Sequence, residues 1–520
     1  MTIAFTLDGA AVEVRDDGAS LLEVLRDRLG RRTAKDGCSP QGQCGCCTVL
    51  VDGEPRVACV TPARRVAGRQ VTTLDGLDPA VRDRWADALC ATGGSQCGFC
   101  TPGIVVRLAA LGDPAPAAVD QALLAHLCRC TGWQTIREAA ALVGGAPAGA
   151  APRHRHRTGG ARRDLDAAAR RATIEGGTPQ SVGPGVALGG GGFADDTAPA
   201  GALVAVPDAA GGWAVGETLR DARAAAAKVQ GRRSTVPLAH PLDIPEGDWA
   251  VRLRTTWVEP AYLEPDASWC EPGGEPASPL ANGGAFGGKR RSVVGEVARR
   301  LADEHRRPVR VLLAREDVVR LGPKRPPVAA GMRADGTGVL RVVRTPGIAE
   351  AIARVAPGLT VEEVDVAGPP TSADLRAAGW AEAAVLLAAA RGDVAVTSPG
   401  GAVAHARIEP GGSVRVRVAC GEPLDHVVLR SYCIGAAHMA LGWVRTEGIA
   451  VGADGEVHDL TVRSLGILRS RDMPAVEVEI EPSGGPPVNG SDAVFAAVAA
   501  AAWLDRGLPQ DWPTDRGTTS

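Results

Sequence analysis

The chain has 520 residues, a formal net charge of −3 and 45% hydrophobic residues, so it is long enough to bury several cores. This charge offers no general attraction for nucleic acid, and the longest apolar run, residues 493–504, is too short to cross a bilayer. Met1 is not followed by a basic and then apolar segment, so we expect a cytoplasmic protein with no nucleic-acid or membrane partner.

The first part of the chain predicts a small sheet with one helix packed across it. Residues 2–14 alternate apolar and polar side chains on either side of an Asp-Gly turn, which indicates a hairpin. Ser20 can cap a helix over residues 21–29. Residues 48–51 and 56–60 are expected to form two further strands.

The cysteines are concentrated in this part, because ten of the thirteen lie before residue 131. The first group lies on a glycine-rich stretch, residues 37–49. A plant-type [2Fe-2S] centre uses Cys-x4-Cys-x2-Cys and a distant fourth cysteine. The inner spacing is kept here, but five residues separate the first two cysteines, so we expect a bulge near Pro40. Cys46 is a spare sulfur able to compete with the expected ligands, which are Cys38, Cys44, Cys47 and Cys59.

A second group of four cysteines surrounds a predicted helical hairpin. Pro102 suits the first turn of a helix, a turn is expected at residues 112–116, and residues 119–127 predict a second helix. The hairpin would bring a Cys-x2-Cys pair beside a Cys-x-Cys pair at its open end. The expected ligands are Cys97, Cys100, Cys128 and Cys130.

The two cysteine groups are also compatible with disulfides, with a structural zinc site, or with ordinary buried residues. A cytosolic chain seldom keeps disulfides. A tetrahedral zinc ion would need only one group of four, which the second group could supply. The glycine-bearing loop and the two separate groups favour two [2Fe-2S] clusters. The remaining cysteines outside the groups are interpreted as small apolar residues, namely Cys90, Cys270, Cys420 and Cys433.

Together and in this order, the two motifs resemble the iron-sulfur portion of the xanthine oxidase family of molybdenum hydroxylases, over residues 1–143. The resemblance implies a β-grasp, plant-type ferredoxin domain over residues 1–75 and a helical-bundle [2Fe-2S] domain over residues 76–143. It also implies that Gln96 and Cys130 approach a pterin cofactor.

Gly, Ala, Pro and Arg dominate residues 144–184, which bury too little apolar surface to offset their ordering entropy. We therefore expect a linker there, with the arginines and histidines of residues 153–157 in a solvated connector. Residues 185–520 are expected to form a shortened α/β molybdopterin-binding region. The predicted fold class is therefore α+β and multidomain.

The clearest motif of this last region is Asn-Gly-Gly-Ala-Phe-Gly-Gly-Lys, residues 282–289. As a bare pattern it satisfies a phosphate-binding loop, but Arg290 stands where Ser or Thr should bind magnesium. It resembles the glycine-rich loop that lines the molybdopterin site of the same family. Glycines would let backbone amides approach an anionic pterin, and the phenylalanine would wall off the pocket. The implied cofactor-binding residues are Gln96, Gly284, Phe286 and Gly287.

Two departures from the family weaken the expectation of catalysis. The family's catalytic base is a glutamate in a Gly-x-Gly-Glu stretch, and Gly485 stands at that position here. Glu481 is displaced along the chain and should lie out of reach of the same pocket. Residues 190–256 compress what is a whole subdomain in the family, and residues 351–393 lack its arginine- and glycine-rich loop. No catalytic residue is therefore assigned.

Two functions are compatible with the sequence. The first is a molybdopterin-dependent oxidoreductase that passes electrons from an aldehyde or N-heterocycle through two [2Fe-2S] clusters to an external acceptor. The second is a non-catalytic electron-transfer or assembly subunit of a complete molybdenum hydroxylase. We find no dinucleotide-binding glycine motif between a strand and a helix, so the acceptor or a flavoprotein subunit would be a separate partner. The oligomeric state is left open.

Overall fold

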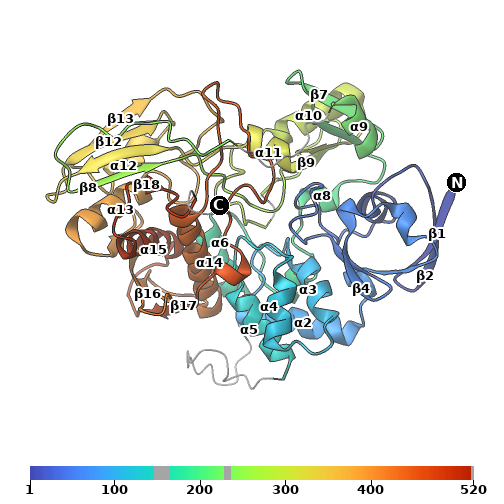
Figure 1. The fold of residues 1–520 in the computed structure, drawn as a ribbon. Coiled ribbons are helices and arrows are strands. Elements are labelled where there is room, and N and C mark those ends of the chain that lie inside the picture. The colour runs from blue at the N-terminus through green and yellow to red at the C-terminus, as the bar shows by residue number, and fades with distance from the viewer. Residues whose placement is uncertain (146–162, 228–235, 281, 517–520) are drawn as a thin grey trace.

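The computed structural model describes residues 1–145, 163–227, 236–280 and 282–516. Figure 1 shows the amino-terminal sheet at one end, a group of helices beside it, and a larger carboxy-terminal region of sheets and helices. The predicted α+β multidomain class is confirmed.

The amino-terminal sheet has the strand order β2-β1-β5-β3-β4, in which β1 and β5 are parallel. Val24 and Leu25 belong to the expected helix and are buried in the same core as Phe5 of the sheet. The backbone N–H of Glu23 donates to Ser20 Oγ at 3.2 Å, which is the predicted cap. The elements are β1 (Thr2–Leu7), β2 (Ala10–Arg15), α1 (Leu21–Glu23) with a π-helical turn (Val24–Arg28), β3 (Thr48–Val51), β4 (Glu54–Val57) and β5 (Gln70–Thr72).

The expected strand over residues 56–60 is shorter than predicted. Strand β4 ends at Val57, and Ala58–Val60 forms a 3-10 turn that carries Cys59 inward. Cys59 is 4% exposed, whereas Val60 is 51% exposed.

Four helices follow the sheet. Pro102 lies in the first turn of its helix and Pro116 begins the next, so the predicted hairpin is confirmed. Asp78 caps the first of the four with its carboxylate, and Gly93 ends it in the left-handed conformation. The helices are α2 (Pro79–Thr92), α3 (Thr101–Ala109), α4 (Pro116–Leu123) and α5 (Gln134–Val143).

Part of the expected linker is a buried helix, α6 (Leu165–Gly176). Its Arg171 and Glu175 are fully buried and form an ion pair at 2.9 Å, and the arginine also donates to three backbone carbonyls. The linker prediction is wrong for these residues, because the charges are compensated and small alanines fit the core. Residues 146–162, which include the basic stretch 153–157, lie outside the described residues.

A four-stranded sheet of order β7-β6-β10-β9 begins the carboxy-terminal region. Helix α10 packs on β9 and β10, and α9 packs on β6 and β7. The elements are α7 (Pro184–Ala187), α8 (Ala194–Thr197), β6 (Leu203–Pro207), β7 (Trp213–Gly216), α9 (Leu219–Ala225), β9 (Ala267–Cys270), α10 (Val294–His305), β10 (Val309–Leu312) and α11 (Arg315–Leu321).

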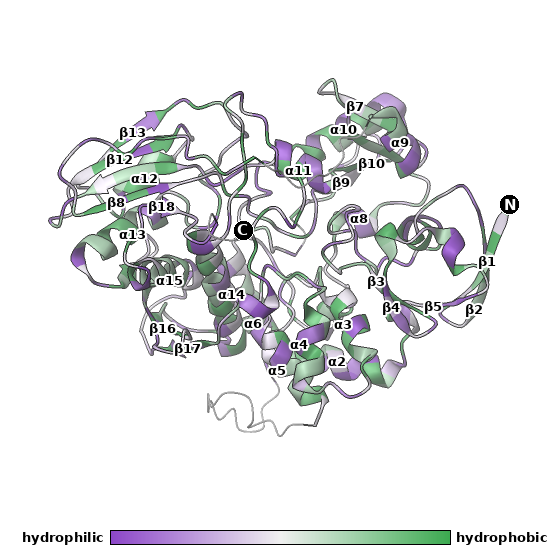
Figure 2. Cartoon of the chain, in the orientation of Figure 1, coloured by the Kyte–Doolittle hydropathy of each residue, from purple (hydrophilic) through white to green (hydrophobic). Residues whose placement is uncertain are grey.

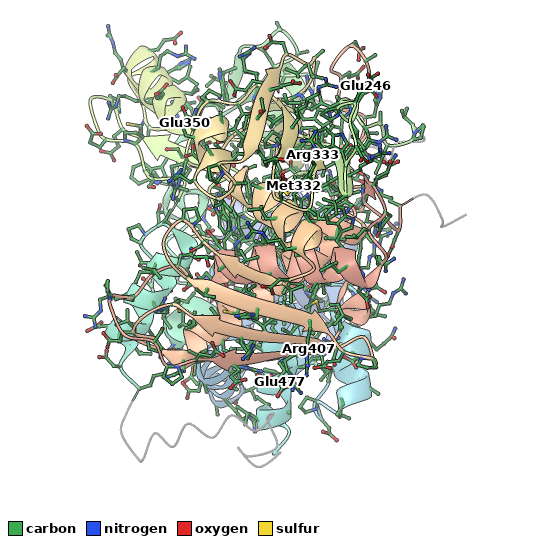
Figure 3. The ribbon with its side chains drawn as sticks, turned by 90° about the vertical axis from the view of Figure 1, so that its left-hand side faces the viewer. Glu246, Met332, Arg333, Glu350, Arg407 and Glu477 are labelled. Carbon is green, nitrogen blue, oxygen red and sulfur yellow. The ribbon has the colours of Figure 1, made fainter. Side chains whose placement is uncertain are left out.

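Two further sheets enclose a layer of helices. Helix α13 contacts the sheet β13-β12-β11-β8-β18, and α14 and α15 contact the sheet β14-β15-β16-β17. In Figure 3, Met332 marks the first sheet, while Arg407 and Glu477 mark the second, with helices between them. The elements are β8 (Val251–Thr255), β11 (Val328–Met332), β12 (Gly338–Val343), α12 (Ile348–Ala353), β13 (Leu359–Val364), α13 (Trp380–Arg391), β14 (Ala395–Thr397), β15 (Val403–Ile408), β16 (Val414–Ala419), α14 (His426–Arg445), β17 (Val476–Ile480), α15 (Ser491–Asp505) and β18 (Asp511–Trp512).

Helices α14 and α15 form the centre of this region. Hydrophobic residues cover most of α15, as the green colouring of Figure 2 shows. Among the described residues, α14 is the one helix long and apolar enough to cross a membrane, yet 89% of its most apolar window is buried inside the protein. It also packs on α2 and α6, so it is a core helix that joins the two parts of the chain.

Candidate metal centres

The first cysteine group is a buried loop that folds around its own sulfurs. The backbone N–H groups of Gln41 and Gln43 donate to Cys38 Sγ at 3.3 and 3.5 Å. The Cys38 thiol also contacts those of Cys44 and Cys59, and these contacts lower its pKa well below the ordinary value. A loop of this kind stabilises thiolate, the form that binds metal.

The rest of this group continues a row of contacting sulfurs. The contact of Cys59 with the thiols of Cys38 and Cys47 raises the pKa of Cys59 strongly. The extra residue of the loop is accommodated at Ser39, whose φ is +41°, next to Pro40 as predicted. The structure therefore brings together the four expected sulfurs, Cys38, Cys44, Cys47 and Cys59.

The second group consists of two thiol pairs. Cys97 Sγ and Cys130 Sγ are 3.6 Å apart. Cys100 contacts Cys128, and this contact lowers the pKa of the Cys128 thiol to about 6. Each pair joins one cysteine from the segment just before α3 to one from the segment before α5, so the hairpin places all four at one end.

The pairing in the second group is compatible with a binuclear centre. A structural zinc ion gathers four ligands around one atom, whereas four thiolates hold the two irons of a [2Fe-2S] centre. Nowhere in the described ranges do three or more His, Cys, Asp or Glu side chains converge to hold one metal ion. All thirteen cysteines are free, so disulfides do not account for them either. The donor chemistry fits two [2Fe-2S] centres.

Glycines let the segments that carry the two groups pack closely. A Cβ atom on Gly37 would lie 3.0 Å from Cys44 Sγ and 3.2 Å from the ring of Phe99, next to the second group. A Cβ on Gly103 of α3 would lie 2.4 Å from the carbonyl oxygen of Gly45. Cys46 is fully buried, and its Sγ would lie 3.1 Å from the same Cβ on Gly37. The spare sulfur therefore lies where the two cysteine-bearing segments meet.

The glycine-rich loop of the carboxy-terminal region covers the second group. A Cβ on Gly284 would lie 2.9 Å from Cys97 Cβ and 3.6 Å from Cys130 Sγ. Asn282 Nδ2 donates to the carbonyl oxygen of Cys97 at 3.0 Å. The loop therefore lies directly on the cysteines, and Asn282 is a contact that the sequence interpretation did not single out.

Gln96 and Phe286 lie near the second group with different surroundings. Gln96 Nε2 donates to Cys130 O and to Ser431 Oγ, both at 2.8 Å, while its buried Oε1 has no hydrogen-bond partner within the described residues. Phe286 has a φ of +46°, and the guanidinium of Arg376 lies 4.2 Å from its ring centre.

Gly287 is held against a neighbouring loop. A Cβ there would lie 1.8 Å from the carbonyl oxygen of Asp374, so the backbone approach requires glycine. Lys289, the last residue of the motif, is buried and paired with Glu264 at 2.8 Å. Burial raises the pKa of Glu264 to about 7. The lysine is therefore engaged by a carboxyl group and is not presented to a phosphate.

The residues between the second group and Phe286 do not fit a pterin. One cavity of about 10 Å³ borders Cys97 and Cys130, and one of about 30 Å³ borders Phe286 and Arg129. Ligand sites usually occupy about 300–1,000 Å³. A larger pocket of about 380 Å³ also borders Phe286, and three arginines line it: Arg290, Arg354 and Arg376.

The position at which the resemblance expects a catalytic glutamate lies at the surface. Gly485 is exposed, has a φ of +98°, and a Cβ there would meet nothing within 4 Å. Glu481 is partly exposed and pairs with Arg417 at 3.2 Å. Neither residue lines the three cavities that border Phe286 or the second cysteine group.

Comparisons with known proteins agree with the iron-sulfur part. Residues 73–141 match the model of a [2Fe-2S] binding domain. The aldehyde oxidoreductase of Megalodesulfovibrio gigas is 39% identical over 153 residues, which are 27% of this chain and 17% of that protein. Isoquinoline 1-oxidoreductase subunit alpha of Brevundimonas diminuta is 38% identical over 141 residues, 26% of this chain and 92% of the subunit.

The likeness in fold is more extensive than the likeness in sequence. A solved structure of the aldehyde oxidoreductase from Desulfovibrio gigas has a TM-score of 0.67 at 14% sequence identity, over 99% of this chain and 99% of that one. Fold and cysteine groups together define an iron-sulfur electron-transfer protein with [2Fe-2S] clusters. The chain belongs to the xanthine oxidase family of molybdenum hydroxylases.

Proposed function

We propose that the chain carries electrons through two [2Fe-2S] centres as part of a molybdenum hydroxylase assembly. The first centre would be held by Cys38, Cys44, Cys47 and Cys59, and the second by Cys97, Cys100, Cys128 and Cys130. When bound, such centres move single electrons. The observation that carries the proposal is the close packing of the two cysteine-bearing segments, with glycines at residues 37 and 103 where side chains would separate them.

The exposure of the two groups supports a direction for the transfer. The second group lies beneath Gly284 and beside α14, whereas residues 40–43 of the first loop are partly exposed. Val60, directly after Cys59, is exposed and lies over Gly42 of the same loop. We infer that electrons enter at the second group and leave at the first.

The surface beside the first loop supports an acidic acceptor. Gln43 Oε1 accepts a hydrogen bond from the backbone N–H of Arg463 at 3.0 Å, which places that arginine beside the loop. Partial burial and the charges of Arg463 and Arg471 lower the pKa of Arg469. This basic patch, Arg463, Arg469 and Arg471, would attract an acidic redox protein, because complementary charge steers association.

Metal analysis with one ligand variant tests the proposal. Protein purified without oxygen should contain about four irons per chain, two for each centre, and a matching amount of acid-labile sulfide. Cys100→Ser should abolish one of two reduced-state paramagnetic signals. Cys90→Ser is the matched control, because Cys90 lies in the same helical part but outside both groups. Colourless protein, or loss of neither signal in Cys100→Ser, would refute the assignment.

A second candidate function is a molybdopterin-dependent oxidoreductase acting on an aldehyde or N-heterocycle. The pocket of about 380 Å³ favours it, because its volume is that of a ligand site, and Arg290, Arg354 and Arg376 line it together with Glu175, Asp374 and Asp492. Stoichiometric molybdenum together with turnover in the presence of a dye acceptor would support this function. Four irons without molybdenum would support the carrier instead.

A further inference from the structure

Arg129 lies between Cys128 and Cys130 in the sequence, and its charged guanidinium is buried. Its side chain is 4% exposed and Glu447 is 2% exposed. The two guanidinium nitrogens Nη1 and Nη2 donate to the two carboxylate oxygens of Glu447 at 2.5 and 2.6 Å. Nε donates to the carbonyl oxygen of Pro260 at 3.2 Å. The charge next to Cys128 and Cys130 is therefore fixed in place by three hydrogen bonds.

The carboxy-terminal region is built to admit this carboxylate. The backbone N–H of Glu447 donates to Gly442 O at 2.7 Å, which turns the chain back at the end of α14. A Cβ on Gly442 would lie 2.1 Å from Glu447 Oε1, so only glycine leaves room. Burial raises the pKa of Glu447, and the charges of Arg129 and Arg325 oppose that rise.

Stability alone does not account for a buried pair of this kind. The cost of removing two charges from water can exceed their mutual attraction, so apolar residues of similar volume often stabilise a core equally well. What the pair supplies is a charge at a defined position in a region of low dielectric, where it acts strongly on neighbouring groups. Arg129 lines a small cavity together with Cys97, Cys100 and Cys130, so its side chain lies against the second group.

We propose that Arg129 tunes the second [2Fe-2S] centre, raising its reduction potential, and that Glu447 is the positioning residue that holds the guanidinium there. A positive charge near the centre stabilises the added electron, and net charge is among the factors that set such potentials. The inference rests on the proposed function, because it needs the second group to hold a centre. It adds a role for two residues outside the ligand set.

Redox titration of both centres, followed by electron paramagnetic resonance, tests the proposal. Arg129→Met should lower the equilibrium constant for reduction of the second centre about tenfold, which lowers its reduction potential by about 59 mV for one electron. Glu447→Gln should raise the reduction potential of the second centre, because the negative charge of the carboxylate is lost while a hydrogen-bond acceptor for Arg129 remains. Arg129→Lys should restore most of the wild-type value. In each variant, the reduction potential of the first centre should shift by less than about half as much as that of the second centre.

Opposite shifts are the result that a purely structural role would not give. The control is Arg430→Met, which breaks a bidentate pair with Glu138 between α14 and α5 and should leave both potentials unchanged. Arg129→Met/Glu447→Met leaves no unpaired buried charge and covers the case in which a single variant fails to fold. It should lower the reduction potential of the second centre by less than Arg129→Met does, because loss of the carboxylate partly offsets loss of the guanidinium. Shifts of the same sign, or none, with both signals retained would overturn the proposal. Loss of both signals in the wild type would instead refute the proposed function.

Discussion

The iron-sulfur part and the carboxy-terminal region share one continuous hydrophobic core, yet they differ in how closely they follow their relatives in sequence. The first part is 39% identical to the Megalodesulfovibrio gigas enzyme over 153 residues, whereas the likeness in fold over the whole chain has 14% identity. Thiol groups need fixed spacing and glycine contacts, because small displacements would pull sulfurs apart. A core needs volume and pattern, which many sequences supply. Where the second part touches the first, it is also constrained, as at Gly284 and Gly435.

The largest effect is expected where the carboxy-terminal loop meets the cysteines. Gly284→Ala should remove or strongly perturb the signal of the second centre, because the new Cβ would lie 2.9 Å from Cys97 Cβ. Gly273→Ala is the control, since Gly273 has a similar φ, +69° against +83°, but open space around it. Equal spectra for the two variants would mean that the loop does not constrain the second centre.

A buried histidine of the carboxy-terminal region should make it sensitive to acid. Burial lowers the pKa of His438 to about 3 from 6.5, so its contribution to stability is present above pH 6.5 and is lost as the pH falls toward 3. The loss is about 5 kcal/mol, on the order of 1.4 kcal/mol for each pKa unit.

Urea unfolding as a function of pH measures this loss. His438→Gln should flatten the acid limb, because an amide can still donate to the carbonyl oxygen of Leu468 without taking up a proton. His405→Gln, at a half-buried strand position, is the control. An unchanged acid limb in His438→Gln would show that other groups dominate.

Reversing the basic patch should change the rate at which the first centre reacts with charged oxidants. The triple variant Arg463→Glu, Arg469→Glu and Arg471→Glu should react about tenfold more slowly with ferricyanide at low ionic strength, and faster with hexaammineruthenium(III). Stopped-flow oxidation of the reduced protein measures both rates. Arg300→Glu, on helix α10 and outside the patch, should leave them unchanged. If the triple variant reacts with each oxidant at the same rate as the wild type, the exit lies elsewhere.

The smallest effect is expected at the position of the missing glutamate. Gly485→Glu should cost about 1–2 kcal/mol for the left-handed backbone and leave turnover unchanged. The side chain would extend into open space at the surface. Assays with a dye acceptor measure the turnover. An increase in turnover would mean that the loop carrying Gly485 reaches the metal pocket in the working protein.

Much of the iron-sulfur part could be predicted from the sequence, because local signals decide it. The cap at Ser20 and the prolines at the starts of α3 and α4 act within a few residues. The meeting of four cysteines at one end of the hairpin followed from two short spacings, whereas which thiols pair did not. Strand β4 ended early because Cys59 had to turn inward, which no local propensity encodes.

The rest depended on contacts between distant segments. Helix α6 looked like a linker by composition, since the partners of Arg171 lie more than 250 residues away for the carbonyls of Glu422 and Pro423. Glu447 and Ser431 gave no motif, and their importance comes only from the fold that sets them beside Arg129 and Gln96. The glycine-rich loop was recognised, but its contact with the cysteines themselves was not.

Helix α14 crosses the second group so closely that a Cβ on Gly435 would lie 1.8 Å from the carbonyl oxygen of Cys130. Each residue of an α-helix advances the chain by about 100° around the axis. Insertion or deletion of a single residue ahead of Gly435 would therefore rotate a larger side chain, Ile434 or Ala436, into that carbonyl. Length variation among descendants of this chain should thus be absent from α14 and accumulate in the loops around it.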